Sequence, residues 1–378
     1  MRRNLNLLGL ATVALLLATS SASYAATFSG LGDLSGGIFY SRMVDASDDG
    51  SVVVGEGNST SGVEAFRWTQ GEGIVGLGDL PGSSFTSFAN GVSGDGLVVT
   101  GIGRSTLGFE AFRWTQDGGM IALGDLPGGA FSSNVAGVSR DGSILAGSGS
   151  SALGQEAFRW TPAGGMVGLG DLPGGAFRSS SVRISSDGSV IAGTGTSAFG
   201  DQAFRWTSAS GMIGLGDLAG GSVYSAAHGI SGDGSAIVGQ SVSAAGLEAF
   251  RWTISDGMVG LGDLTGGSFQ SFAADASWDG SIVVGAASNA LGFRAMIWDA
   301  TNGMRDLQSV LSTTYGLDLT GWTLEEARAI SANGLVFVGN GKNPSGQSEG
   351  WIAVIPEPST ALLMLLGLAG LSLRRGQN

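Results

Sequence analysis

The chain of 378 residues contains no cysteine, one histidine (His228) and one lysine (Lys342). Without cysteine there can be no disulfide bond, reactive thiolate or cysteine-ligated metal. A single histidine excludes a histidine metal cluster, and any Ser-His triad would have to use that one residue. We expect His228 to be a packed or surface residue rather than a metal ligand or catalytic residue. The positions 46 and 92 residues earlier, which match it in the repeat described below, hold Val182 and Ala136.

Charge is also scarce. Charged residues make up 13% of the chain, the formal net charge is −13, and between the two ends of the chain the basic residues are scattered singly. Nucleic-acid binding needs clustered basic residues, so no nucleic-acid partner is expected. Glycine is abundant (69 residues), but hydrophobic residues reach 43% and keep a strict register, which favours a folded protein over a low-complexity one.

Three short sequence motifs recur at the same spacing of 46 residues. Tryptophan returns every 46 residues, at Trp68, Trp114, Trp160, Trp206, Trp252 and Trp298. The word Leu-Gly-Asp-Leu carries Asp33, Asp79, Asp125, Asp171, Asp217 and Asp263. The word Ser-x-Asp-Gly carries Asp49, Asp95, Asp141, Asp187, Asp233 and Asp279. A period of about 40–50 residues is typical of one propeller blade.

One repeat predicts four short strands, at 88–93, 97–99, 110–115 and 120–126. The Asp-Gly pair between the first two predicts a hairpin with a type I′ turn. A four-stranded antiparallel sheet of this size cannot bury both faces unless neighbouring sheets stack on it.

The two ends of the array complement one another. Residues 27–34 match a fourth strand without its first three, and 327–331, 335–339 and 351–355 match the first three without a fourth. Pairing the two ends would leave no open edge. We therefore predict an all-β fold, a seven-bladed β-propeller of four-stranded antiparallel blades closed by an N-terminal strand that completes the last blade. An open solenoid or sandwich array is the alternative.

The last repeat carries the only sizeable insertion. Residues 308–311 are predicted to form a helical turn, and 315–322 a longer loop. Insertions in repeat proteins often lie on the binding face, so the segment is a candidate for ligand contact. A packed closure element explains it equally well.

The N-terminus has the pattern of a secretory signal. Met1-Arg2-Arg3 precedes an apolar run at 5–18, and small residues lead to a cleavage site after Ala25. We expect residues 1–25 to be a signal peptide and 26–355 to be the repeat domain. An uncleaved N-terminal membrane anchor is the alternative.

The C-terminus carries Pro356-Glu357-Pro358, an apolar segment at 360–373, and then Arg374 and Arg375. This end resembles the PEP-CTERM sorting signal, whose members are exosortase substrates and commonly accompany exopolysaccharide production. The resemblance implies that residues 356–378 form a sorting signal with a short transmembrane segment, processed near the Pro-Glu-Pro motif. The arginines would then hold the end in the cytoplasm. A plain membrane tail is the alternative.

Residues 30 to 355 resemble the HAF family of probable extracellular repeat proteins. The resemblance rests on Ala111-Phe112-Arg113-Trp114, Leu123-Gly124-Asp125-Leu126 and Val52-Val53-Val54-Gly55. The family's histidine is replaced here by Glu64, Glu110, Glu156, Glu248, Gln202 and Arg294. Because such different side chains are tolerated, we interpret the position as a loop-to-strand junction rather than a site.

No catalytic constellation stands out from the repeat. The Leu-Gly-Asp-Leu aspartates could bind calcium, accept hydrogen bonds from turn amides or pair with the repeated arginines, and calcium is the least favoured of the three. The repeated Phe and Trp are expected to pack between blades. The aromatic residues outside the repeat pattern are the better candidates for stacking on sugars: Trp278, Trp322, Phe269 and Tyr224.

These observations predict an exported, surface-directed, non-catalytic binding or matrix protein without a cofactor. Its expected partners are an exosortase-type processing enzyme and extracellular polysaccharide, with membrane contact only through the C-terminal segment. A polysaccharide lyase or glycosidase on the same scaffold, and a self-associating surface protein, stay open as alternatives.

Overall fold

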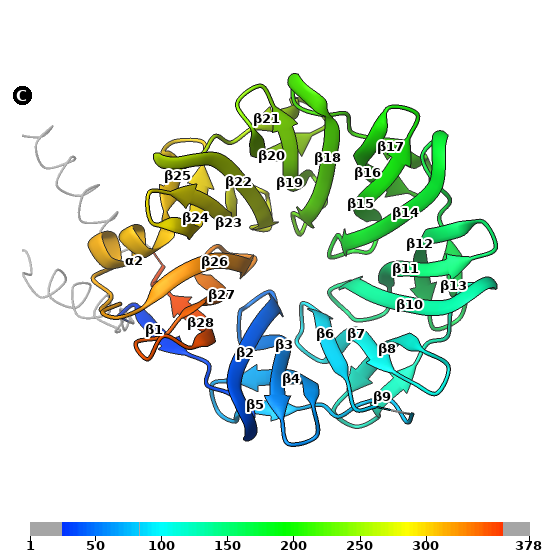
Figure 1. Cartoon of the computed structure of the whole chain (residues 1–378), viewed down its shortest axis with the longest axis horizontal. Helices are drawn as coiled ribbons and strands as arrows, with labels where there is room; N and C mark the ends of the chain where they lie inside the picture. The colour runs from blue at the N-terminus through cyan, green and yellow to red at the C-terminus, as the bar shows by residue number, and fades with distance from the viewer. Residues whose placement is uncertain (1–24, 83, 358–378) are drawn as a thin grey trace, which may run out of the picture. The chain divides into compact units, whose positions relative to one another are not determined.

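A computed structural model describes residues 25–82 and 84–357. The compact unit Thr27–Val354 is built almost entirely of short β-strands, which fall into four classes by their place in the repeat (Figure 1). The first strands are β2 (Gly36–Ala46), β6 (Ser87–Val92), β10 (Gly128–Val138), β14 (Gly174–Ile184), β18 (Gly220–Ile230), β22 (Gly266–Ala276) and β26 (Thr323–Ile330). The second strands are β3 (Val52–Ser59), β7 (Val98–Arg104), β11 (Leu145–Ser151), β15 (Val190–Ser197), β19 (Ala236–Ser243), β23 (Ile282–Asn289) and β27 (Val336–Lys342).

The third and fourth strands complete each sheet. The third strands are β4 (Val63–Thr69), β8 (Phe109–Thr115), β12 (Gly154–Thr161), β16 (Gly200–Thr207), β20 (Leu247–Thr253), β24 (Gly292–Asp299) and β28 (Ser348–Val354). The fourth strands are β5 (Gly73–Gly76), β9 (Gly119–Ala122), β13 (Gly165–Gly168), β17 (Gly211–Gly214), β21 (Gly257–Gly260), β25 (Gly303–Asp306) and β1 (Thr27–Gly30).

The strands of each repeat pair antiparallel in chain order, as predicted. Three pairs of neighbouring sheets are also joined by one parallel contact each, between Val63 and Thr86, between Gln155 and Arg178 and between Leu247 and Gln270. The sheets pack face to face, with the first strands turned toward a common centre (Figure 1). This arrangement is a β-propeller.

The N-terminal strand is far from its repeat in sequence but makes the contacts of an ordinary fourth strand. β1 pairs antiparallel with β28, with Thr27 opposite Val354. The amide of Leu31 donates to the carbonyl of Gly350 at 2.9 Å. The amide of Leu77 donates to the carbonyl of Ala65 in the same way in the sheet of β2–β5. The predicted partnership of the two chain ends is therefore present in the strand pairing.

The predicted type I′ turn is wrong. In the Ser-x-Asp-Gly turn only the glycine has a positive φ, for example Gly96 at 73°, whereas a type I′ turn needs two such residues. The hydroxyl of Ser93 donates to Asp95 and accepts from the amide of Val98, while Asp95 accepts from the amide of Leu97. These side-chain bonds stabilise a longer loop in which the aspartate keeps an ordinary backbone conformation.

The fourth strand is shorter than predicted. It ends at Ala122 rather than at residue 126, because Gly124 turns the chain with φ at 81°. The Leu-Gly-Asp-Leu word is thus a turn between sheets and not strand sequence. The insertion in the last repeat contains a helix, α2 (Leu307–Tyr315), longer than the single turn predicted, with Asp306 at its N-cap and Gly316 at its C-cap.

The core lies between the sheets. Phe112 is fully buried and packs against Val54 and Ala65 of the preceding sheet. The same phenylalanine is fully buried in the other repeats that have it: Phe66, Phe158, Phe204 and Phe250. The expectation that the repeated aromatic residues pack between sheets is confirmed.

A buried serine on each of six first strands links one sheet to the next. The hydroxyl of Ser133 donates to the carbonyl of Gly124, at 2.5 Å, and accepts from the amide of Ala111, at 3.0 Å. Both partners belong to the preceding sheet or its turn. The bridging serines are Ser41, Ser87, Ser133, Ser179, Ser225 and Ser271, and each is at most 1% exposed.

Replacing one bridging serine should destabilise the protein. Ser133→Ala leaves a buried amide and a partly buried carbonyl without their partner, so the free energy of unfolding should fall by about 1–3 kcal/mol. Urea denaturation measures this loss. The control is Ser132→Ala, because Ser132 is exposed and uses its backbone amide for its hydrogen bond to Asp125. Equal stability of the two variants would contradict a structural role for the hydroxyl.

Candidate functional site

The Ser-x-Asp-Gly turns meet where the first strands end. Their backbones form a belt of hydrogen bonds in which each turn contacts the next. The bonds run from Asp48 N to Gly94 O, Asp95 N to Arg140 O, Arg140 N to Ser186 O, Ser186 N to Gly232 O, Asp233 N to Trp278 O, Trp278 N to Ala332 O and Ala332 N to Asp48 O, at 2.8–3.2 Å. The last bond returns to the first turn, so the belt encloses a space lined by residues from every first strand.

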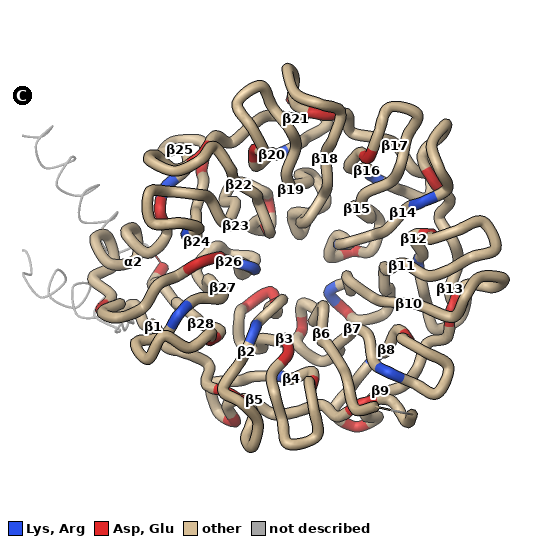
Figure 2. Tube along the Cα trace, viewed as in Figure 1, with Lys and Arg blue, Asp and Glu red and all other residues tan. Residues whose placement is uncertain are grey.

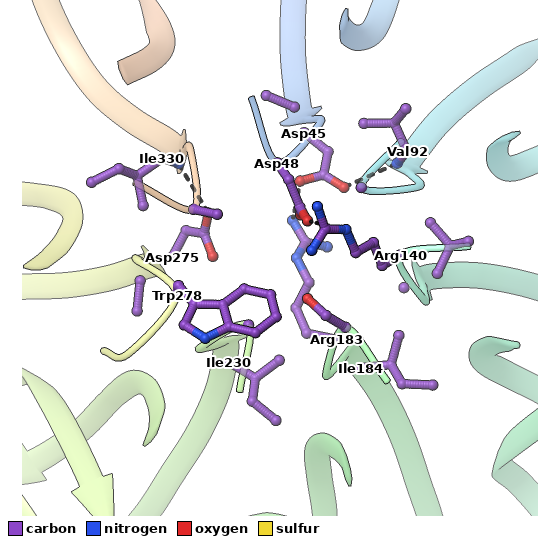
Figure 3. Close-up of a pocket in the computed structure, with 18 residues that line it drawn as sticks. Asp45, Asp48, Val92, Arg140, Arg183, Ile184, Ile230, Asp275, Trp278 and Ile330 are labelled. Atoms are coloured by element: carbon purple, nitrogen blue, oxygen red, sulfur yellow. Dashed lines mark hydrogen bonds and ion pairs between the residues drawn. The ribbon is translucent and has the colours of Figure 1, made fainter. Parts of the chain in front are cut away.

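We call this space the axial pocket. Its volume is about 90 Å³, which admits a group of a few atoms and not a large ligand. The charged side chains around it are Asp45, Asp48, Arg140, Arg183 and Asp275, and Trp278 adds an aromatic ring (Figure 3). In Figure 2, residues of both charge signs surround this centre.

Two of the acids have a basic neighbour. Arg140 Nε lies 3.1 Å from Asp48 Oδ2, and Arg183 Nη2 lies 4.0 Å from Asp45 Oδ1. Burial raises the pKa of Asp48, and the Arg140 guanidinium opposes that shift. Arg183 is further held by the Ala136 carbonyl, to which its Nη1 donates at 2.9 Å.

The third acid has no such partner. Asp275 Oδ2 accepts a hydrogen bond from the Ile330 amide at 3.0 Å, and no ion pair to Asp275 forms within residues 25–82 and 84–357. Burial raises the pKa of Asp275 to about 7, and the more distant Arg183 only partly offsets the effect. Asp275 therefore changes charge near neutral pH.

The sequence analysis did not identify the charged residues of the axial pocket. Asp45, Arg183 and Asp275 share one repeat position, which is glycine in three other repeats, at 91, 137 and 229. A charged residue that replaces glycine in a repeat is a usable signal. It becomes a cluster only because the sheets bring their first strands together at one place.

A second cavity lies next to the axial pocket and shares Arg183 with it. His228 lines it beside Phe272, with 6.2 Å between the ring centroids, and Arg328 lines it as well. Burial, reinforced by the charge of Arg328, lowers the pKa of His228 to about 4. His228 is thus half-buried and uncharged at neutral pH, and the sequence analysis expected a packed or surface histidine.

A wider groove lies between the sheet of β22–β25 and the strands β26 and β27. Its volume is about 520 Å³, within the usual range of small-molecule sites. Phe272 and Phe293 form an aromatic wall, with ring centroids 6.2 Å apart, and Leu291 is 77% exposed at the rim. The polar side chains of this groove are Arg294, Glu325, Glu326 and Asn340.

The repeated acids have structural partners. Asp79 of Leu-Gly-Asp-Leu accepts hydrogen bonds from the amides of Leu80, Thr86 and Arg104, which is the turn-amide interpretation. No ion pair joins the repeated arginines to these aspartates within the described residues; Arg67 pairs instead with Glu72 at 3.1 Å, and Arg251 with Asp256 at 3.9 Å.

The glutamates at the position of the family's histidine have a role that the sequence analysis did not find. Glu64 accepts from the amide of Gly78 and so supports the turn that leaves the fourth strand. The same bond recurs at Glu110, Glu156, Glu248 and, next to β1, Glu349.

The four aromatic candidates for sugar stacking do not form one site. Trp278 is 40% exposed and lines the axial pocket. Trp322 packs edge-on against Phe28, with ring centroids 5.1 Å apart. Phe269 is 37% exposed, and Tyr224 accepts a hydrogen bond from Gln240. The aromatic pair of the groove, Phe272 and Phe293, was not among the candidates.

The terminal predictions fall largely outside the described residues. Ala25 and Glu357 are exposed and Pro356 is half-buried, all three outside any helix or strand, while Pro358, Arg374 and Arg375 lie beyond the described range. Within that range, no helix is both long and apolar enough to cross a membrane. The described residues also contain no group of three or more His, Asp or Glu placed to hold a metal ion.

No protein-family model matches the sequence, and neither does any curated protein. Among solved structures, the chain is similar to a prolyl endopeptidase, with 11% identity and a TM-score of 0.52 over 84% of this chain and 50% of that one. It is also similar to an acylaminoacyl peptidase in complex with Z-Gly-Gly-Phe-chloromethyl ketone, with 10% identity and a TM-score of 0.51 over 83% and 51%. TolB from Acinetobacter baumannii gives 14% identity and a TM-score of 0.48 over 68% and 63%.

The chain thus spans about half the length of the two peptidases and 63% of TolB. At these identities the likeness to the two peptidases concerns the fold alone.

Asp275 should make stability depend on pH. The pKa of Asp275 in the folded protein, about 7, lies above the ordinary aspartate pKa of 3.8, so its contribution to stability is complete below the lower value and is lost as pH rises through the higher one. Between pH 5 and pH 8 the wild-type protein should lose stability relative to Asp275→Asn, whose side chain does not titrate. Urea denaturation of both proteins at several pH values tests this, and a pH-independent difference would contradict it.

The single histidine allows a direct titration. The imidazole C2 proton of His228 should report a pKa near 4 in the folded protein and near the ordinary histidine pKa of 6.5 in urea. Proton NMR gives both curves, and His228→Gln identifies the signal by its loss. A folded-state midpoint near 6.5 would show that His228 is solvated and not packed.

Proposed function

We propose that the protein is an exported, surface-directed binding protein that attaches to extracellular polysaccharide. Its scaffold in this proposal is a seven-bladed β-propeller, closed by β1 in the last blade. The pairing of β1 with β28 and the belt bond from Ala332 back to Asp48 support closure. The proposed export rests on the signal-like N-terminus and on the resemblance of residues 356–378 to an exosortase sorting signal.

The observation that carries the binding proposal is the groove between β24 and β26. One side offers the rings of Phe272 and Phe293, and the other offers Glu325 and Asn340. Sugars present C–H faces that pack on aromatic rings and hydroxyls that donate to carboxylate and amide oxygens. An aromatic wall facing a few polar groups is therefore suitable for carbohydrate.

The groove also lies where the repeat departs from its own pattern. Arg294 stands where five other repeats have glutamate and one has Gln202, and Glu325 belongs to the strand that follows the insertion. The other sheets lack both features, so the ring would carry one groove of this composition among the described residues. The insertion itself contributes α2, which contacts β24 and β26, and this supports a closure role.

Polysaccharide binding should depend on Phe293. The purified protein is incubated with the exopolysaccharide of its own host and assayed by co-sedimentation. Phe293→Ala removes one of the two rings of the aromatic wall and should weaken binding about tenfold, which corresponds to about 1.4 kcal/mol. Glu325→Gln should weaken it less, because an amide oxygen still accepts hydrogen bonds.

A matched control exists four repeats earlier. Phe109 is at the same strand position and is 37% exposed, compared with 40% for Phe293, but it lies outside the groove. Phe109→Ala should bind like the wild type. Loss of binding in both variants, or no binding by the wild type, would refute the groove as the site. Release of soluble fragments would instead identify the protein as a polysaccharide-cleaving enzyme.

A further inference from the structure

The axial pocket has a charge imbalance that its own residues do not neutralise. It contains the carboxylates of Asp45, Asp48 and Asp275 but only two guanidinium groups, and each of those already lies beside an acid. One oxygen of Asp275 accepts from the Ile330 amide, and the other has no hydrogen bond to the described residues. Since Asp275 lines the pocket, that second oxygen is available to a ligand.

An aromatic ring lies beside this carboxylate. Trp278 is the only aromatic residue among the x positions of the Ser-x-Asp-Gly turns. A Cβ at Gly232 would lie 2.6 Å from the indole, so the absence of a side chain at Gly232 makes room for the ring. Figure 3 shows the indole beside Asp275, with the side chains of Arg140 and Arg183 across the pocket from both.

The indole already attracts a cation. The guanidinium of Arg140 lies over Trp278, 5.9 Å from the ring centroid, which is near the outer limit of a cation–π contact. The Arg140 side chain is 59% exposed, so it lies at the rim of the pocket and not inside it. A cation closer to the ring would face both the π-electrons and the Asp275 carboxylate.

We propose that the axial pocket binds a small organic cation, a primary ammonium or guanidinium group, between the Asp275 carboxylate and the Trp278 indole. The volume of about 90 Å³ fits the charged tip of such a molecule and excludes a larger ring system. Arg140 competes for the same ring face. The site is separate from the polysaccharide groove, with which it shares no lining residue.

Methylammonium chloride is the probe. The purified full-length protein, labelled with ¹⁵N, is titrated at pH 8 while the indole N–H signal of Trp278 is followed by NMR. That signal is assigned by its loss in Trp278→Phe. The wild type should show a saturable shift that an equal concentration of sodium chloride does not produce.

Two variants of pocket residues should change the affinity for methylammonium in opposite directions. Asp275→Asn should weaken binding by at least about tenfold, because it removes the carboxylate that pairs with the cation. Arg140→Ala should strengthen binding, because it frees the ring face and leaves Asp48 without its cation. Phe293→Ala, in the groove, should leave the dissociation constant unchanged.

Absence of a saturable shift in the wild type would overturn the proposal. The same dissociation constant in Asp275→Asn, or weaker binding in Arg140→Ala, would also overturn it. Because Arg140 is exposed, its variant remains informative if Asp275→Asn fails to fold. Loss of polysaccharide binding in the same Asp275 variant would count against the separation of the two sites.

Discussion

The rest of the structure depends on one repeated contact, the buried serine that bridges neighbouring sheets. A four-stranded sheet of four-to-eleven-residue strands cannot bury both of its faces alone. Packing of phenylalanine between sheets removes apolar surface from water, but such contact is non-directional. The bridging serine adds direction, because its two hydrogen bonds, one to a strand amide and one to a turn carbonyl, hold each sheet at one position on the next.

Identical spacing has a functional consequence. When neighbouring sheets are held in the same way, residues at one position of the first strands gather around one centre. A residue that departs from the repeat at such a position therefore lies at that centre. Asp45, Arg183 and Asp275 replace glycine at such a position and create the axial charges. Between β24 and β26 the serine bridge is replaced: Gln308 of α2 donates to the Trp322 carbonyl and accepts from the Leu324 amide. The groove lies beside this altered junction.

The repeated part of the fold could be predicted from sequence because its motifs reflect the local requirements of turns and of buried strands. Asp-Gly marked each turn, and Phe at two-residue spacing from Trp marked the buried face. The turn type and the short fourth strand could not be predicted, because side-chain bonds from Ser93 and the backbone of Gly124 decide them locally. The groove and the axial pocket escaped prediction because their residues come from different repeats, and only tertiary packing brings them together.

Closure of the ring is the central claim, since both candidate sites combine residues from early and late repeats. The most direct measurement is disulfide formation in Thr27→Cys/Val354→Cys, whose positions face each other across β1 and β28. The native chain has no cysteine, so any disulfide must join these two. Bonding requires Cα atoms within about 4.4–6.8 Å. The account predicts a monomeric oxidised product on mass spectrometry and none from Thr27→Cys/Val259→Cys. Free thiols or intermolecular dimers in the first variant would contradict closure.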